Sequence, residues 1–335
     1  MSPDLHRSIL LAVARDGSNV AARLAKRRKV TRQAASAWLA NLIKAGELIS
    51  SGVGRGVRYQ LKPLAERRQE YPREGLHEDR VWTEVFLPAL RDLPDNVKDL
   101  WRYAVTEMVN NAIDHSGSAN VIAGLQRDAL NTTAYVADEG EGIFLKIQKA
   151  LGLYDPREAI LELAKGKLTT DPAHHTGEGI FFSSKVMDVF DIRSGRLHFM
   201  RDGLGADILR ERPADAPGTL VVLRLANDSP KKLREVFDQF AAPEEYTFAK
   251  TIVPVRLALH EGEKLVSRSQ AKRLTLRFER FQTVVLDFAG VEEIGQAFAD
   301  EVFRVFRNAH PATHLLPANM TPAVENMVKR AMAAR

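Results

Sequence analysis

The chain has 335 residues, more than the usual ~100–200 of one domain, which predicts two or three folded units. Hydrophobic residues make up 45% and charged residues 27% of it, as in folded globular proteins rather than disordered ones. Cysteine is absent, which excludes disulfides, thiolate zinc sites and cysteine nucleophiles. Without an apolar run of ~20 residues, and with Asp4, His6 and Arg7 near the start, we expect a cytoplasmic protein that neither spans nor contacts a membrane.

Residues 1–63 are expected to form three helices and a hairpin. Apolar periodicity predicts helices near residues 5–14, 20–25 and 31–45, the last with Thr31 as N-cap and Gly46 as its stop. Two strand-like pieces, 47–50 and 57–61, flank a glycine-rich stretch. This pattern is typical of a winged helix-turn-helix and resembles bacterial transcription regulators.

The same region is strongly basic. Residues 1–70 carry 14 Lys and Arg against 5 Asp and Glu, a net charge of +9, whereas the remaining residues have a net charge of −4. A basic head on a nearly neutral body suggests a polyanionic partner, so we expect double-stranded DNA, with protein pairing as the alternative. The start of the third helix would enter the major groove. The expected DNA-binding residues are Arg32, Gln33 and Ser36 on this helix and Arg55 and Arg58 on the hairpin.

The rest of the chain predicts a linker and two further units. Residues 64–79 are charged and contain Pro72 and Gly75, which suits a linker. Residues 80–226 mix helical and strand-like segments without regular alternation, which favours an α+β sandwich, and the long connection 143–176 predicts a lid. Residues 247–335 predict a small α/β domain with strands at 251–259 and 283–288, a further short strand, and helices at 264–281, 294–308 and 322–334.

Three polar clusters in the middle unit indicate a nucleotide site. Glu107, Asn111 and Asp114 recur at helical spacing and share one face, where a carboxylate and an amide can hold water and a hydrated Mg²⁺ beside a triphosphate. Such a stripe is, taken alone, more often solvated surface. The second cluster, Asp138-Glu139-Gly140-Glu141-Gly142, follows an apolar strand, and the third, Thr176-Gly177-Glu178-Gly179, leads into a helix whose N–H groups can cradle phosphates.

In this order the clusters resemble the N box and the two glycine boxes of the GHKL ATPase superfamily, which includes type II topoisomerase ATPase domains, histidine kinases and anti-sigma-factor serine kinases. The matching segments are EMVNNAIDH, DEGEG and TGEGIFFSSKVMDVF, and the resemblance covers about residues 85–226. It implies that Glu107 polarises the attacking water, that Asn111 holds Mg²⁺ and that Asp138 accepts from the adenine amino group of ATP. The remaining cofactor-binding positions are Asp114 near the base, Gly140 and Gly142 in the base pocket, Thr176, Gly177 and Gly179 in the phosphate segment, and Thr219 in support of Asp138.

Several residues are candidates for contact with the phosphates of ATP. No P-loop motif with its lysine is present, so Mg²⁺ and backbone dipoles would have to neutralise them. Lys165 and Lys167 are either additional phosphate contacts or solvated lysines of the lid. His174 and His175 either touch phosphate or lie on the surface of the lid.

The C-terminal segment VVLDFAGVEEIGQAFADEVFRVF resembles the STAS domains of anti-sigma-factor antagonists, over about residues 250–335. In that family a GHKL kinase phosphorylates a serine or threonine at the start of a helix. The corresponding stretch here, Ile294-Gly295-Gln296-Ala297-Phe298, has no hydroxyl group, which excludes that reaction at this place. An interaction with a protein partner, or homodimerisation, is the role left to the domain.

The sequence therefore predicts a multidomain α+β protein with a winged helix at 1–63, a GHKL α/β sandwich at 80–226 and a STAS-like α/β domain at 247–335. We expect an ATP-binding, DNA-binding transcriptional regulator in which Mg-ATP occupancy controls DNA or partner binding. The alternative is a GHKL-type serine kinase or ATPase that acts on a partner protein, with DNA binding secondary. The sequence does not decide between them, or whether ATP is hydrolysed.

Overall fold

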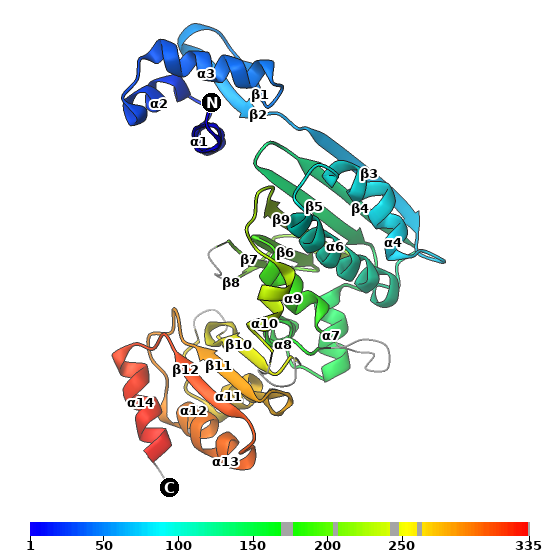
Figure 1. Cartoon of the computed structure of the whole chain (residues 1–335). Helices are drawn as coiled ribbons and strands as arrows, with labels where there is room; N and C mark the ends of the chain where they lie inside the picture. Colours follow the sequence, from blue (N-terminus) through cyan, green and yellow to red (C-terminus); the bar gives the residue numbers. More distant parts are fainter. Residues whose placement is uncertain (169–176, 204–206, 242–247, 260–262, 334–335) are drawn as a thin grey trace.

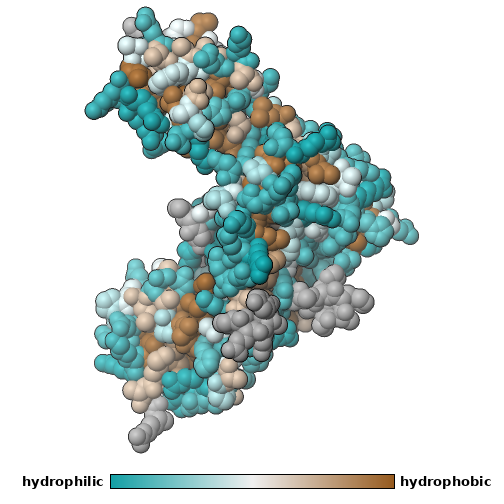
Figure 2. All heavy atoms as spheres, viewed as in Figure 1, coloured by the Kyte–Doolittle hydropathy of each residue, from teal (hydrophilic) through white to brown (hydrophobic). Residues whose placement is uncertain are grey.

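The computed structural model describes residues 1–168, 177–203, 207–241, 248–259 and 263–333. An N-terminal helical unit, a central unit built on a large sheet and a C-terminal α/β unit follow one another along the chain (Figure 1). Hydrophilic residues cover most of the face shown in Figure 2. Within the described ranges, no helix has both the length and the apolar character needed to cross a bilayer.

The N-terminal unit has the helices and the hairpin that the sequence predicts. Helix α3 begins where Thr31 caps it, since the Thr31 side chain accepts from the backbone N–H of Ala34 at 3.1 Å. It is followed by Gly46, whose φ of 78° ends the helical path. The elements are α1 (Pro3–Arg15), α2 (Val20–Arg28), α3 (Arg32–Lys44), β1 (Leu48–Ser51), a 3-10 turn (Gly54–Gly56) and β2 (Arg58–Leu61), with β1 and β2 antiparallel.

The central sheet has the strand order β3-β4-β5-β9-β6-β7-β8, and each neighbouring pair is antiparallel. Its strands are β3 (Ala65–Pro72), β4 (Asn120–Arg127), β5 (Asn131–Asp138), β6 (Val189–Ser194), β7 (Leu197–Arg201), β8 (Asp207–Glu211) and β9 (Thr219–Ala226). The long helix α6 packs on β4 and β5 and against α9. The helices are α4 (Glu78–Val81), a π-helical turn (Trp82–Phe86), α5 (Leu87–Leu90), α6 (Asp95–His115), α7 (Ile143–Leu151), α8 (Glu158–Lys165), α9 (Gly179–Val186) and α10 (Leu233–Asp238).

Part of the expected linker is a strand of this sheet. Residues 65–72 form β3, which pairs with β4 from Ala65 opposite Arg127 to Pro72 opposite Asn120. Tyr71 is buried at 2% exposure, whereas most of its neighbours in β3 are exposed. Backbone pairing with β4 holds this strand at the sheet edge, so it needs few apolar side chains, and its charged composition therefore resembles that of a linker. Charged side chains on an edge strand also oppose pairing with other chains.

The expected lid also contains regular structure. Helices α7 and α8 lie within 143–176, and Leu168 is the last described residue before Gly177. In α8 both apolar and charged residues are buried, including Ile160, Glu162 and Lys165. This segment is therefore a packed wall up to Leu168, rather than a loop over the site.

The C-terminal unit has a parallel sheet of order β10-β11-β12. The strand expected at 251–259 ends earlier, because a 3-10 helix follows Pro254, and the helix expected at 264–281 is shorter. Ser267 and Gln270 form a capping box that starts this helix at Arg268, and Arg277, at a φ of 65°, lies beyond its end. The elements are β10 (Lys250–Pro254), a 3-10 helix (Val255–Ala258), α11 (Arg268–Thr275), a 3-10 helix (Phe278–Arg280), β11 (Thr283–Asp287), α12 (Gln296–Asp300), a π-helical segment (Glu301–Phe306), α13 (Arg307–Ala309), β12 (His314–Ala318) and α14 (Pro322–Ala333).

Hydrophobic packing joins the units in two ways. One core extends through both the central and the C-terminal units. A separate core fills the N-terminal unit and includes Leu130, which lies in the turn between β4 and β5 of the central sheet and is 5% exposed. The N-terminal unit is therefore docked on the central sheet through an inserted side chain.

Candidate functional site

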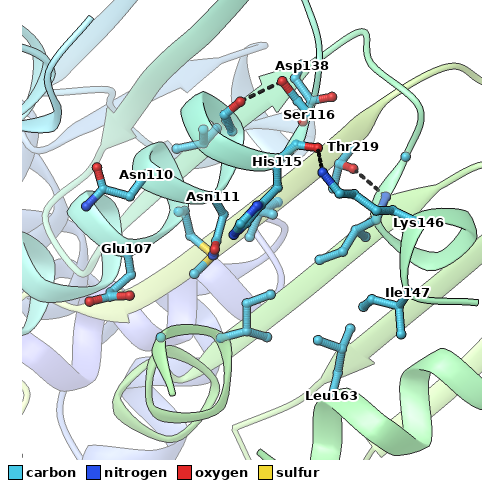
Figure 3. A pocket seen from close by; sticks show the side chains of 18 of the residues that line it. Glu107, Asn110, Asn111, His115, Ser116, Asp138, Lys146, Ile147, Leu163 and Thr219 are labelled. Carbon is cyan, nitrogen blue, oxygen red and sulfur yellow. Dashed lines mark hydrogen bonds between the residues drawn. The ribbon is translucent and has the colours of Figure 1, made fainter. Parts of the chain in front are cut away.

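A cavity of about 280 Å³ opens between helix α6, the start of α9 and the ends of strands β5 and β9. Ligand pockets usually measure ~300–1,000 Å³, so the cavity lies just below that range. Asp138 and Thr219 lie at the end of the cavity away from Glu107, with Leu163 and Ile147 across from α6 (Figure 3). Residues distant in sequence thus line one space.

Helix α6 supplies one wall because it is amphipathic. Its buried stripe, which includes Trp101, Val105 and Val109, packs into the core. Glu107 and Asn111 face the cavity, as expected. Asp114, in contrast to what its spacing predicts, does not line the cavity and is exposed.

The last turn of α6 contributes His115 instead. The backbone carbonyl of His115 accepts from the Lys146 Nζ at 2.6 Å, which fixes α7 against the end of α6 (Figure 3). Both His115 and Lys146 line the cavity. Helix α6 continues through His115, so Asp114 is still helical and lies on the exposed side of the last turn, while His115 faces the cavity.

Asp138 stands at the carboxyl end of β5, opposite Thr219 at the start of β9. Its carboxylate accepts from the backbone N–H of Gly140 at 2.9 Å. Burial raises the pKa of Asp138 above its ordinary value, although hydrogen bonds from the backbone N–H groups of Gly140 and Thr219 oppose the shift. The site therefore holds a carboxylate whose charge is incompletely compensated by the protein.

Thr219 and the glycines around Asp138 shape this end of the cavity. The Thr219 hydroxyl accepts from the backbone N–H of Ile143 at 3.0 Å, so it anchors the start of α7, while strand pairing places it beside Asp138. Gly142 lines the cavity at a φ of 89°, a conformation that side chains rarely adopt. Gly140 does not line the cavity. It packs against Ser116 instead, and a β-carbon on Gly140 would lie 1.9 Å from the Ser116 carbonyl oxygen.

The opposite end is bounded by Gly177 and Gly179. Gly177 has a φ of 71°, and its carbonyl accepts from the Leu168 N–H at 3.0 Å. A β-carbon on Gly179 would lie 1.9 Å from the Glu107 Oε2, so the start of α9 passes directly over that carboxylate. Gly179, which is expected at the phosphates, and Glu107, which is expected to act on water, are therefore neighbours.

Asn111 carries a buried polar atom that lacks a partner. Among the described residues, its side-chain nitrogen has no hydrogen-bond partner, although this atom is inaccessible to solvent. The described residues also include no group of three or more His, Cys, Asp or Glu side chains suited to a metal ion. A metal here would have to rely on few protein atoms, which is how Mg²⁺ binds beside phosphates.

Several expected residues lie elsewhere or outside the described part of the chain. Thr176, His174 and His175 fall in the range 169–176, which the structure does not describe. Lys165 contacts neither solvent nor the cavity: it is 0% exposed and faces the C-terminal unit. Lys167 donates from Nζ to the Arg280 carbonyl at 3.0 Å and so also faces that unit.

Sequence reasoning missed several residues of the cavity. Asn110 lines it beside Asn111, and the repeated asparagine was the available signal. Leu163 and Leu168 were missed because their segment looked like a lid. Gly218 does not line the cavity but was missed as a structural requirement beside it: its φ is 73°, and a β-carbon would lie 1.9 Å from the Asp138 carbonyl oxygen, so glycine is required before Thr219.

Four of the five expected DNA-binding side chains are described, and all four are exposed on the N-terminal unit. Arg32, Gln33 and Ser36 are exposed on the first turns of α3, and Arg58 is exposed on β2. Nothing is described for the side chain of Arg55. The start of α3 is thus available to a large partner.

The turn between β4 and β5 holds the N-terminal unit. Asp128 accepts from the N–H groups of Leu130 at 2.7 Å and Asn131 at 2.8 Å, which forms a tight turn. Asn227, just beyond β9, donates from Nδ2 to the Asp128 carbonyl at 2.8 Å and from its backbone N–H to the Leu130 carbonyl at 2.9 Å. Arg7 of α1 pairs with Asp228. Strands β5 and β9 therefore run from the cavity to this contact.

No curated protein matches the chain. Residues 270–325 match the family described as STAS-like domain of unknown function (DUF4325). The match lies within the C-terminal unit and covers strands β11 and β12 with the helices between them. The C-terminal unit is therefore similar to that family and contains the STAS-like domain that the sequence predicted.

Proposed function

We propose that this chain is an ATP-binding, DNA-binding transcriptional regulator in which Mg-ATP occupancy of a GHKL-type site controls DNA or partner binding. The observation that carries the proposal is the shared cavity: residues from 107–111, 138–142 and 177–179 line it together with Thr219. These are the segments in which the sequence resembles the GHKL superfamily. Agreement between three sequence motifs and one cavity favours a nucleotide site over a solvated polar stripe.

Asp138 would select the base. A partly buried carboxylate is costly unless it is paired, and the adenine amino group can donate to it. A nucleobase without a hydrogen-bond donor at that position would leave Asp138 unpaired in a desolvated site. A hydrogen-bonding pocket discriminates strongly against such a ligand. The raised pKa of Asp138 in the free protein agrees with a carboxylate that awaits a donor.

Asn111 and Glu107 would act at the phosphate end. An Asn side chain can turn its oxygen or its nitrogen towards a site, so the buried and unpartnered end of Asn111 fits a ligand to Mg²⁺. When bound, Mg²⁺ supplies positive charge next to the phosphates. Glu107 lies beside Gly179 and would accept a proton from an attacking water, which makes it the candidate general base.

The test is calorimetry of Mg-ATP with the full chain. Asp138→Ala removes the acceptor and should weaken binding by about 1–3 kcal/mol, the cost of losing a buried hydrogen bond. Glu107→Ala is the matched control, because a general base acts in the transition state and its loss should preserve binding. Unchanged affinity in Asp138→Ala would contradict the assignment of the base pocket.

DNA binding is supported by charge and exposure. Residues 1–70 carry a net charge of +9, whereas the rest of the chain is at −4, and the exposed start of α3 presents Arg32, Gln33 and Ser36 on one surface. This arrangement suits a helix that enters a major groove, with Arg58 near the phosphate backbone. Protein pairing through the same surface is the competing outcome.

The connection between the two sites supports control by nucleotide. Strand β5 ends at Asp138 and begins beside Leu130, and strand β9 starts at Thr219 and ends beside Asn227. Two hydrogen-bonded strands thus join the cavity to the docking point of the N-terminal unit. A nucleotide that shifts the ends of these strands would move the surface on which that unit rests.

One observation favours the alternative of a kinase or ATPase that acts on a partner protein. Glu107 and Gly179 also line a second hollow of about 990 Å³ between α6, α9 and α10. Through this hollow a second molecule could reach the Glu107 carboxylate, and its volume would admit a segment of a partner protein as well as water. Transfer of the ATP γ-phosphate to a hydroxyl-bearing partner would favour this alternative, and ATP-dependent DNA affinity without transfer would exclude it as the main activity.

A further inference from the structure

The segment from Glu162 to Leu168 is shared between the cavity and the C-terminal unit. Leu163 and Leu168 line the cavity, and the Leu168 N–H donates to the Gly177 carbonyl at 3.0 Å. The segment therefore forms a wall of the proposed nucleotide site. It also fixes one of the glycines expected at the phosphates.

Arg277 of the C-terminal unit forms hydrogen bonds with this segment at three residues. Its guanidinium donates to the Glu162 Oε2 at 2.8 Å and to the Gly166 carbonyl at 2.9 Å, and it also donates to the Lys167 carbonyl. Arg277 is only 6% exposed. Because the guanidinium is planar and rigid, these bonds fix both the position and the orientation of the segment.

Lys165 completes the same network from the opposite side. Its Nζ is fully buried and donates to the Glu162 Oε1 at 2.5 Å, to the Leu276 carbonyl at 2.9 Å and to the Arg273 carbonyl at 3.2 Å. Arg273 in turn donates to Glu158 at 3.1 Å. Two cations thus share the buried Glu162 carboxylate, so the loss of either partner would leave a buried charge uncompensated.

We propose that Arg277 is a positioning residue of the nucleotide site, through which the STAS-like domain sets the wall formed by Leu163 and Leu168. The STAS-like domain is then part of the nucleotide site, and a partner that binds this domain has a physical route to nucleotide affinity. By linkage, nucleotide changes the affinity for that partner by the same factor. The inference rests on the proposed function, because it concerns the same cavity.

The experiment uses the full chain with Arg277→Lys, which keeps the charge but cannot reach Glu162, Gly166 and Lys167 together. The matched control is Arg304→Lys, since Arg304 makes a similar forked pair with Asp300 in the same domain, at 2.5 and 2.8 Å, but on a more exposed helix face. We expect at least tenfold weaker Mg-ATP binding by calorimetry in Arg277→Lys. Amide hydrogen exchange of Gly166 and Leu168 should also be faster, with both readouts unchanged in the control.

The outcomes separate the two proposals. Wild-type protein that binds no ATP would overturn the proposed function and this inference together. Wild-type protein that binds ATP, with equal affinity in Arg277→Lys, would overturn this inference alone. If Arg277→Lys does not fold, Glu162→Gln removes the shared carboxylate charge at constant volume, and it should weaken Mg-ATP binding and speed exchange in the same way; wild-type values in a folded Glu162→Gln would again overturn the inference.

Discussion

Gly179 and Gly140 have equally crowded surroundings but different neighbours. A β-carbon would approach the movable end of Glu107 at Gly179 and the fixed Ser116 carbonyl at Gly140, each at 1.9 Å. Gly179→Ala should therefore displace the carboxylate and lower any ATP hydrolysis at least tenfold, with little effect on folding. Gly140→Ala should cost about 1–3 kcal/mol of unfolding free energy. Single-turnover hydrolysis and urea titrations measure both; normal hydrolysis in Gly179→Ala would place the base elsewhere.

At Asp138 the requirements of binding and stability oppose each other. Burial raises the pKa of this carboxyl above the ordinary value of 3.8, so the folded protein holds the proton more tightly than the unfolded chain does. Stability contributed by the protonated carboxyl is thus lost as the pH rises from about 3.8 through the raised pKa. Asp138→Asn cannot ionise, and without nucleotide it should gain stability relative to wild type as the pH rises from 4 to 7. Urea unfolding at the two pH values checks this; a constant difference would contradict it.

At the scale of elements, the turn between β4 and β5 connects the N-terminal unit with the central sheet. Leu130→Ala should lower the stability of the N-terminal core by about 2–5 kcal/mol, as expected for a buried leucine. It should also remove any effect of Mg-ATP on DNA affinity, while ATP affinity itself is kept. Leu64→Ala is the control, since Leu64 is near the same junction but 44% exposed. A nucleotide effect that survives in Leu130→Ala would show that the turn does not transmit it.

For the whole molecule, the proposed function requires reciprocal binding. If Mg-ATP changes DNA affinity, DNA must change ATP affinity by the same factor, typically ~5–150-fold. Fluorescence anisotropy with duplex DNA and calorimetry with ATP, both on the full chain, give the two factors. Arg32→Ala should weaken DNA binding and its salt dependence without altering ATP affinity in the absence of DNA. ATP affinity that is equal with and without DNA would favour the enzyme alternative.

DNA binding has to be measured on the full chain, because the N-terminal unit is completed by residues of the central unit. A fragment that ends near residue 63 looks self-sufficient in the sequence, because it contains three helices and a hairpin. In the structure its core also contains Leu130, and Arg7 pairs with Asp228. A truncated N-terminal unit would therefore expose part of its own core, and weak DNA binding by such a fragment would not test the recognition surface.

Much of the local structure could be predicted from the sequence, because it is fixed by short-range physics. Thr31 caps α3 through a hydrogen bond three residues away, and Gly46 ends it through a backbone conformation that glycine tolerates best. The helical spacing of Glu107 and Asn111 likewise puts both on one face. Periodicity, caps and glycines thus determined most of the element types and the candidate residues of the cavity.

Tertiary structure decided the features that depend on distant partners. Strand β3 was hidden because pairing with β4 stabilises it through the backbone, which leaves no apolar pattern to read. Lys165, expected in a lid, became fully buried because Glu162 and carbonyl groups more than 100 residues away satisfy its charge. Asp114, which shares a helical face with Glu107 by spacing alone, is exposed because the neighbouring segments pack against the other side of the last turn of α6, where His115 lines the cavity. Side-chain type and spacing are local properties of a sequence, whereas the partners that bury a charge or pair a strand exist only once the chain has folded.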